Sequence, residues 1–381
     1  MSGSENSIEV IGTSNAQDPI EAVRDALTEA GKALGAAGCG PQHMTAMRWE
    51  AAEPLRFHPS RHEIELAQRE AFAGFRVPVT LKRVKEVAGL RAVIKAEKPE
   101  NPPGTAPVYR GYAPMEMARQ YSPRFQTDMN VLFKDWSRQG EAFRAQFLGL
   151  GLDLCYGPGR YETFDIFMPE GDERPPVWVF VHGGYWQASD KNQHAQLGKG
   201  MLEAGFAVVM ANYALAPENS LANIVAQITR LLTYLVEQAD SLGVDASRLH
   251  IAGHSAGGHI AGMIAARGSA PTLRSALLLS GVFDLEPLTF LPMGKVLALT
   301  PDIIASLSPL RQPAPRGVKI GVAVGDTESD EFKRQSREMA AHWNAPEALI
   351  VPGHHFSMLE GLNSGALLDL ARSLAGDLTQ V

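Results

Sequence analysis

The chain has 381 residues, of which 45% are hydrophobic and 20% charged, and its formal net charge is −7 at pH 7. The acidic balance leaves no basic footprint for nucleic acid, and no apolar run approaches the ~20 residues that a membrane span needs. Cys39 and Cys155 are the two cysteines and lie far apart, which argues against a disulfide framework or a cysteine metal motif. With a polar, acidic start rather than a signal-like one, the sequence predicts a cytoplasmic protein without membrane or nucleic-acid partners.

The first part of the chain predicts a small α+β domain over residues 1–98. Apolar residues at helical spacing, from Ile20 to Leu34, form a stripe that Gly38 closes. The predicted elements are, in chain order, a helix over 19–37, a strand over 44–51, a helix over 61–72 and strands over 76–84 and 90–96. Helices in this order can pack on one face of a sheet.

This order of elements, with the segments 18–27 and 34–38, resembles the Rid (reactive intermediate deaminase, YjgF/endoribonuclease L-PSP-like) family. The resemblance places Arg76 where that family has its substrate-carboxylate arginine. It also implies a homo-oligomer, because Rid relatives usually form trimers with sites between subunits.

The resemblance is incomplete at the last predicted strand of this domain. The acidic residue expected there is not evident among Arg91, Val93 and Lys95. Two roles therefore stay open. The domain serves oligomerisation or shapes the entrance to a neighbouring site, or it deaminates an imine or enamine to a ketone and ammonia, which would make the chain bifunctional.

A charged and then proline-rich stretch ends this domain, and residues 99–107 are its predicted linker. Proline-rich segments are semi-rigid and exposed, which suits a boundary. Because 381 residues exceed what one α/β core usually holds, residues 108–381 are predicted to form a second domain.

The second domain contains a buried-strand run over 176–181 that ends directly in His-Gly-Gly-Tyr-Trp at 182–186. Two glycines at a strand end can turn their N–H groups into a cavity. Gly183 and Gly184 are therefore candidate donors to a developing oxyanion, a contribution of roughly 3 to 4 kcal/mol per donor in studied hydrolases. The alternative is a glycine-rich turn without chemistry.

Gly-His-Ser-Ala-Gly at 253–257 follows an apolar strand over 247–252 and precedes a small-residue helix over 258–266. This context is typical of a nucleophile elbow with Ser255 at its tip. The N–H group of Ala256 would add a third oxyanion donor. His254 and His259 are interpreted as packing residues.

A base and an acid must accompany such a serine. A last strand over 347–351 leads to two histidines, of which His355 is the predicted base and His354 the second choice. A strand over 319–324 ends in a loop with several carboxylates, which the residues alone do not rank. Asp284, after the strand over 276–280, is a further possible acid.

The motifs at 182–186 and 253–259, with 280–288, 328–336 and 355–356, resemble the kynurenine formamidase (arylformamidase) branch of the α/β-hydrolases. The resemblance implies a mostly parallel sheet with helices on both faces. It makes Ser255 the nucleophile, His355 the base and Glu328 the acid, with Asp326 as the alternative. Family members tend to have aspartate at the position of Glu328, and glutamate can serve there.

The implied reaction is acyl transfer without a metal or cofactor. Its substrate is expected to be a small molecule, an N-formyl arylamine such as N-formylkynurenine, with Tyr185 and Trp186 walling an aromatic pocket or merely packing under a loop. Two alternatives stay open. One is a carboxylesterase or a carbamate or amide hydrolase of aromatic catabolism, and the other is a scaffold protein with a decayed hydrolase fold.

Overall fold

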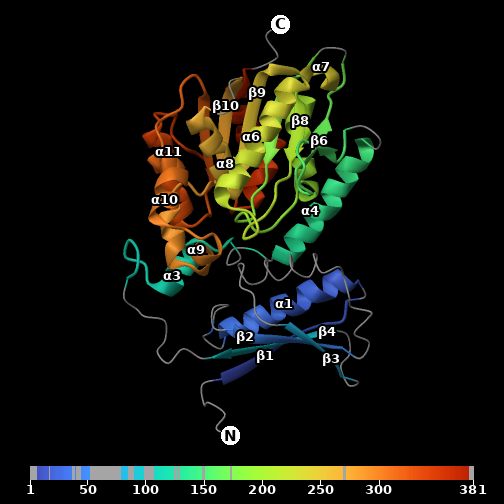
Figure 1. Cartoon of the computed structure of the whole chain (residues 1–381), viewed down its shortest axis with the longest axis vertical. Coiled ribbons are helices and arrows are strands. Elements are labelled where there is room, and N and C mark those ends of the chain that lie inside the picture. The colour runs from blue at the N-terminus through green and yellow to red at the C-terminus, as the bar shows by residue number, and fades with distance from the viewer. Residues whose placement is uncertain are drawn as a thin grey trace. The chain divides into compact units, whose positions relative to one another are not determined.

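The computed structural model separates the chain into two compact units, each of which is described by itself (Figure 1). One comprises Met1–Met117 with Leu288–Val296, and the other Ala118–Pro287 with Leu297–Val381. The residues that the structure describes are 7–16, 18–36, 39, 44–51, 79–84, 90–97, 107–123, 127, 129–147, 151–171, 174–268 and 272–376. The predicted linker lies almost entirely outside them.

The N-terminal unit contains a four-stranded sheet in the order β1-β4-β2-β3. Its elements are β1 (Ser7–Ser14), α1 (Pro19–Ala36), β2 (Met44–Ala51), β3 (Val79–Arg83) and β4 (Leu90–Glu97). β4 pairs antiparallel with β1 and β2, and β3 pairs parallel with β2. The predicted helix over 19–37 and the strands over 44–51 and 90–96 are confirmed, and β3 lies within the strand predicted over 76–84.

The core of this unit joins α1 to the sheet. The apolar stripe of the helix, including Leu27 and Leu34, packs in one cluster with Met47, Trp49 and Ile94. The backbones of β1 and α1 also approach closely, since a Cβ on Gly12 would lie 2.0 Å from the carbonyl oxygen of Ala26. β1 was not predicted, and the predicted helix over 61–72 and Arg76 lie outside the described residues.

The larger unit contains an eight-stranded sheet in the order β12-β11-β10-β9-β7-β8-β6-β5. The strands are β5 (Leu154–Cys155), β6 (Thr163–Phe167), β7 (Pro176–Val181), β8 (Ala207–Ala211), β9 (Asp245–His254), β10 (Leu273–Leu279), β11 (Lys319–Gly325) and β12 (Leu349–Val351). From β8 to β12 all neighbours are parallel, and only the β5–β6–β8 edge is antiparallel. The predicted mostly parallel sheet is confirmed.

Helices cover this sheet in two groups (Figure 1). Side chains of β7 such as Trp178 and Phe180 share a core cluster with residues of α4, α5 and α12, whereas α6 and α8 pack against each other. The helices of the larger unit are α4 (Met129–Arg144), α5 (Lys199–Glu203), α6 (Leu221–Glu237), α7 (Ala239–Leu242), α8 (Ala256–Arg267), α10 (Pro301–Leu307), α11 (Asp330–His342) and α12 (Ala366–Ala375). α9 (Pro292–Val296) belongs to the N-terminal unit, and the division between the units falls within α3 (Pro114–Gln120). Short 3-10 turns lie at Ala145–Phe147, Lys191–Gly198, Glu286–Phe290, Pro309–Arg311 and Ser357–Leu362. None of the described helices is long and apolar enough to span a membrane.

Besides His355, the interior of the larger unit holds His182, His194, His250, His254 and His259, each of which is at most 2% exposed. Burial is the main cause that lowers the pKa of each, to about 3 for His194 and about 4 for His250 and His259. Their rings are therefore neutral in the folded protein at pH 7. The unfolded chain, by contrast, binds protons on them below pH ~6.5.

We expect the free energy of unfolding to be constant above pH ~7 and to fall as the pH drops from 6.5 toward 4. The unfolded state then binds protons that the folded state excludes, and the slope approaches ~1.4 kcal/mol per pH unit for each buried histidine. Denaturant titrations between pH 7.5 and 5 measure this. His259→Gln should flatten the profile, because it removes one of these buried histidines. Equal stability at pH 7.5 and 5 would contradict the expectation.

Candidate active site

Ser255 occupies the turn between β9 and α8 with φ 56° and ψ −116°. A non-glycine residue rarely adopts this backbone conformation, and such strain is typical of functional turns. The flanking glycines are needed for space. A Cβ on Gly253 would lie 2.1 Å from the carbonyl oxygen of Gly257, and a Cβ on Gly257 would lie 2.0 Å from that of Val181. The strand, sharp turn and helix of a nucleophile elbow are thus present.

The glycine loop, residues 182–186, follows β7 and passes beside the elbow. A Cβ on Gly183 would lie 3.0 Å from the Cβ of Ser255, so this backbone runs against the serine. Gly184 has φ +106°, which favours glycine. Within the described part of the chain, the N–H groups of Gly183 and Gly184 donate to no other group. Ala256 is the first residue of α8, where N–H groups have no partner within the helix.

His355 and Glu328 form a buried pair beyond the ends of β12 and β11. The imidazole Nδ1 lies 2.7 Å from Glu328 Oε2, and the two residues are 2% and 3% exposed. The other carboxylate oxygen accepts from the N–H of Gly325 at 2.9 Å and from the hydroxyl of Ser280. With three donors, the buried carboxylate is satisfied as an acceptor and can orient the ring.

The other sequence candidates for acid and base do not join this pair. Asp326 is exposed and accepts from the N–H of Gly353 at 2.8 Å, and Asp284 forms an ion pair with Arg311 at 3.4 Å. His354 is half-buried, and its Nδ1 accepts from the backbone N–H of Phe356 at 3.2 Å. Partial burial and the neighbouring His355 lower the pKa of His354.

His254, which sequence reasoning treated as a packing residue, connects the elbow to the loop of His355. Its Nε2 donates to the carbonyl oxygen of His355 at 2.7 Å, and the two ring centroids lie 4.5 Å apart. Burial and the nearby His355 hold the pKa of His254 well below its usual value, so the ring is a neutral donor. A polar side chain at the buried end of a strand is the sequence signal that indicates such a partner.

The aromatic residues of the glycine loop differ in exposure. Tyr185 is half-buried, and its hydroxyl donates to the carbonyl oxygen of Tyr121. Burial and the charge of Glu328 raise its pKa. Trp186 is fully buried and packs edge-on against His259 at 4.9 Å. The structure therefore places Trp186 in the packed interior rather than on an open pocket wall.

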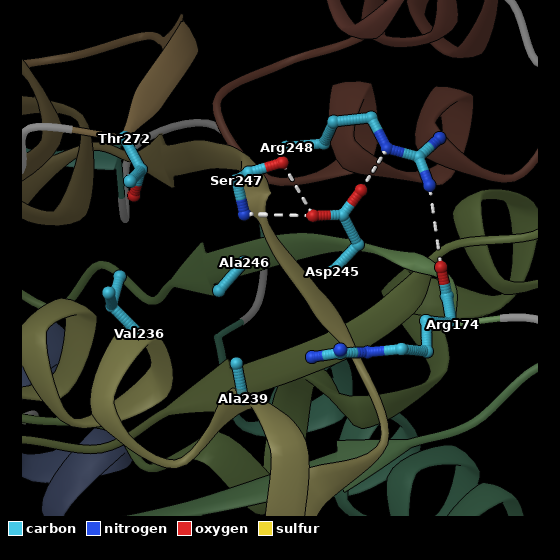
Figure 2. A pocket seen from close by; sticks show the side chains of 8 residues that line it. All are labelled: Arg174, Val236, Ala239, Asp245, Ala246, Ser247, Arg248 and Thr272. Atoms are coloured by element: carbon cyan, nitrogen blue, oxygen red, sulfur yellow. Dashed lines mark hydrogen bonds and ion pairs between the residues drawn. The ribbon is translucent and has the colours of Figure 1, made fainter.

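Figure 2 shows a pocket of about 550 Å³ lined by Arg174, Val236, Ala239, Asp245, Ala246, Ser247, Arg248 and Thr272. Asp245 begins β9 and Ser255 follows its far end, a distance of roughly 30 Å along an extended strand. Arg248 pairs with Asp245 at 2.6 Å, and Arg174 with Asp240 at 2.8 Å. This pocket is therefore separate from the residues around Ser255.

Clusters of metal-binding side chains are absent from the described ranges. No group of three histidine, cysteine, aspartate or glutamate side chains there could hold an ion. The arrangement around Ser255 can perform nucleophilic catalysis, because a serine on a strained turn lies near an oriented imidazole and beside backbone N–H groups that donate to no group in the described part of the chain.

Comparison with known proteins identifies the kind of hydrolase. The family model described as BD-FAE matches residues 164–279. A kynurenine formamidase from Salmo salar is 28% identical over 273 residues, which cover 66% of this chain and 92% of that protein. One from Drosophila melanogaster is 30% identical over 233 residues, 56% of this chain and 77% of the relative. The chain belongs to the kynurenine formamidase family.

Solved structures share the fold of the larger unit. A putative thioesterase from Silicibacter sp. TM1040 is 29% identical, superposes with a TM-score of 0.62, and covers 67% of this chain and 97% of its own. An esterase from Pyrobaculum calidifontis, at 18% identity and a TM-score of 0.50, shares the fold. The protein is a serine hydrolase that acts on amide or ester bonds.

The contact between Glu328 and His355 predicts that these two residues act together. Glu328→Gln should lower kcat/KM by ~10³- to 10⁴-fold, because an amide that donates to Nδ1 stabilises the wrong imidazole tautomer. Asp326→Asn removes an equal charge two residues away and should cost less than ~5-fold. Steady-state kinetics on an aryl ester compare the two variants, and a larger loss in Asp326→Asn would reverse the assignment.

Proposed function

We propose that the protein is an arylformamidase that hydrolyses N-formyl arylamines such as N-formylkynurenine. Ser255 is the nucleophile, His355 the general base and Glu328 the acid that orients it. The N–H groups of Gly183, Gly184 and Ala256 form the oxyanion hole. The buried contact of 2.7 Å between Glu328 and His355, beside the elbow of a chain from this family, carries the proposal.

The reaction proceeds in two acyl-transfer steps. His355 takes the hydroxyl proton of Ser255 as the oxygen attacks the formyl carbon, and the backbone N–H groups stabilise the tetrahedral oxyanion. The imidazolium then gives its proton to the leaving arylamine as the C–N bond breaks. In the second step His355 takes a proton from water, and the water oxygen attacks the formyl ester of Ser255. The imidazolium then returns the proton to the serine oxygen as the ester C–O bond breaks, which releases formic acid and regenerates the enzyme.

A small acyl group suits the space around the serine. Ser255 and His355 are each 2% exposed, and the backbone of Gly183 runs against the serine side chain. A formyl group places a hydrogen atom where an acetyl group places a methyl group, so it demands less room. The half-buried ring of Tyr185 is the candidate contact for the aromatic leaving group.

An acyl series on one arylamine tests the substrate. We expect replacement of formyl by acetyl to lower kcat/KM by at least ~10²-fold, and Ser255→Ala to remove the activity on both. Continuous assays of arylamine release measure the rates, and a serine-directed organophosphate should label the wild type but not Ser255→Ala. A preference for an aryl acetate over the formamide would instead favour a carboxylesterase or another small-amide or carbamate hydrolase. An unlabelled Ser255 would favour a scaffold protein.

For the N-terminal unit we propose a Rid-like fold that serves homo-oligomerisation in a cytoplasmic enzyme. The support is the arrangement of α1 on a mixed sheet and the lack of an acid among Arg91, Val93 and Lys95 of β4. Arg91 is engaged elsewhere, because its guanidinium lies 3.3 Å from the buried carboxylate of Glu50.

This proposal predicts no imine-deaminase activity. Full-length protein should not accelerate ammonia release from an imine that an amino-acid oxidase generates in situ, because Arg91, Val93 and Lys95 of β4 provide no acid to transfer the proton. Light scattering should give a multiple of 41.2 kDa. Acceleration that persists in Ser255→Ala and disappears in Arg76→Ala would show a second active site, and a monomer would exclude the assembly role.

A further inference from the structure

Tyr213 is a buried residue that the reaction described above does not use. It follows β8 by two positions and is fully buried, and its ring stacks on that of His182 with centroids 4.3 Å apart and planes at 12°. Its hydroxyl lies 2.9 Å from the carbonyl oxygen of His182 and 3.3 Å from that of Gly183. One hydroxyl therefore contacts two successive peptide groups of the glycine loop.

These two peptide groups carry the proposed oxyanion donors. The N–H of Gly183 belongs to the same peptide unit as the carbonyl of His182, and the N–H of Gly184 to the same unit as the carbonyl of Gly183. A trans peptide is planar, and its C=O and N–H point in opposite directions. A donor that holds both carbonyl oxygens on one side therefore directs both N–H groups to the other side.

The loop needs a restraint on its peptide planes because it contains two successive glycines, Gly183 and Gly184. Glycine has no Cβ, which lets the backbone approach Ser255, but it also lets the peptide planes rotate. The φ of +106° at Gly184 lies in a region that other residues rarely adopt. An oxyanion hole is effective only when its donors are oriented before the reaction.

We propose that Tyr213 is a positioning residue that orients the N–H groups of Gly183 and Gly184 toward the oxyanion. The inference rests on the proposed role of these glycines. The hydroxyl of Tyr213 contacts these two peptide groups, and it acts on the transition state through their orientation.

His182 provides a second hold on the same loop. Its Nδ1 lies 2.8 Å from the carbonyl oxygen of Gly183 and donates to it in the tautomer that is protonated at Nδ1. Without the Tyr213 hydroxyl, the carbonyl oxygen of Gly183 therefore keeps its contact with the His182 ring, so the N–H of Gly184 stays oriented. The carbonyl oxygen of His182 loses its contact with Tyr213, and the N–H of Gly183 is no longer held. The expected effect is partial loss of the oxyanion hole.

The test compares Tyr213→Phe with Tyr156→Phe on the full chain. Tyr156 is a matched control, because it is 4% exposed and its hydroxyl donates to the carbonyl oxygen of Asn212 at 2.7 Å without touching the glycine loop. We expect Tyr213→Phe to lower kcat by ~10- to 100-fold, with KM changed less than ~3-fold. Tyr156→Phe should keep kcat within ~3-fold, and thermal melts should show similar stability loss in both.

The affinity for a transition-state analogue distinguishes a role in orienting the oxyanion hole from a purely structural role. Phenylboronic acid binds serine hydrolases as a tetrahedral adduct, so its Ki should rise with the same ratio as kcat falls in Tyr213→Phe. If that variant melts below the assay temperature, His182→Phe removes the other hold on the Gly183 carbonyl and should raise the Ki in the same way. Unchanged kcat and Ki in folded Tyr213→Phe, or equal losses in Tyr156→Phe, would overturn the inference.

The outcomes separate this inference from the proposed function. An aryl acetate serves as substrate throughout, so the comparison holds even if the formamide is not hydrolysed. Full activity in Ser255→Ala would remove the proposed site and with it the inference. Loss of activity in Ser255→Ala, together with unchanged kcat and Ki in Tyr213→Phe, would refute only the role of Tyr213.

Discussion

The parallel alignment of β7 to β12 is the constraint on which the active site depends. Parallel strands end at a common edge of their sheet, so residues that follow different strands meet there. His182, Ser255 and Ser280 come directly after β7, β9 and β10, and Glu328 and His355 follow β11 and β12 within four residues. Five separate chain segments thus deliver one polar group each to this end of the sheet.

Burial of the Glu328 carboxylate and of the His254 ring at this edge is tolerated because each has a hydrogen-bond partner. Glu328 accepts from His355, Gly325 and Ser280, and the neutral ring of His254 donates to the backbone of the His355 loop. An unpaired buried carboxylate would cost several kcal/mol, whereas a paired one holds the imidazole in one orientation. The contacts that satisfy the groups are therefore also the contacts that order them for catalysis.

The sequence predicted the features that local patterns determine and missed those that depend on distant contacts. The strand–glycine motifs around Gly183 and Ser255 were predictable because close backbone approach requires glycine at fixed positions. Glu328 and Asp326 lie on one loop, and only the fold shows which carboxylate turns toward His355. β1 was missed because an edge strand is stabilised by its pairing with β4, which is remote in sequence.

Tyr213 illustrates why positioning residues escape motif analysis. A motif records the groups that react, and these need special backbone shapes, so glycines mark them in the sequence. The side chain proposed to hold this backbone follows the neighbouring strand β8. It needs a ring of the right size and one hydroxyl, and no glycine marks it in the sequence. Because β8 is the parallel neighbour of β7, the residues after it lie beside the glycine loop. The same strand order that assembles the candidate catalytic residues therefore also supplies the restraint on the proposed oxyanion donors.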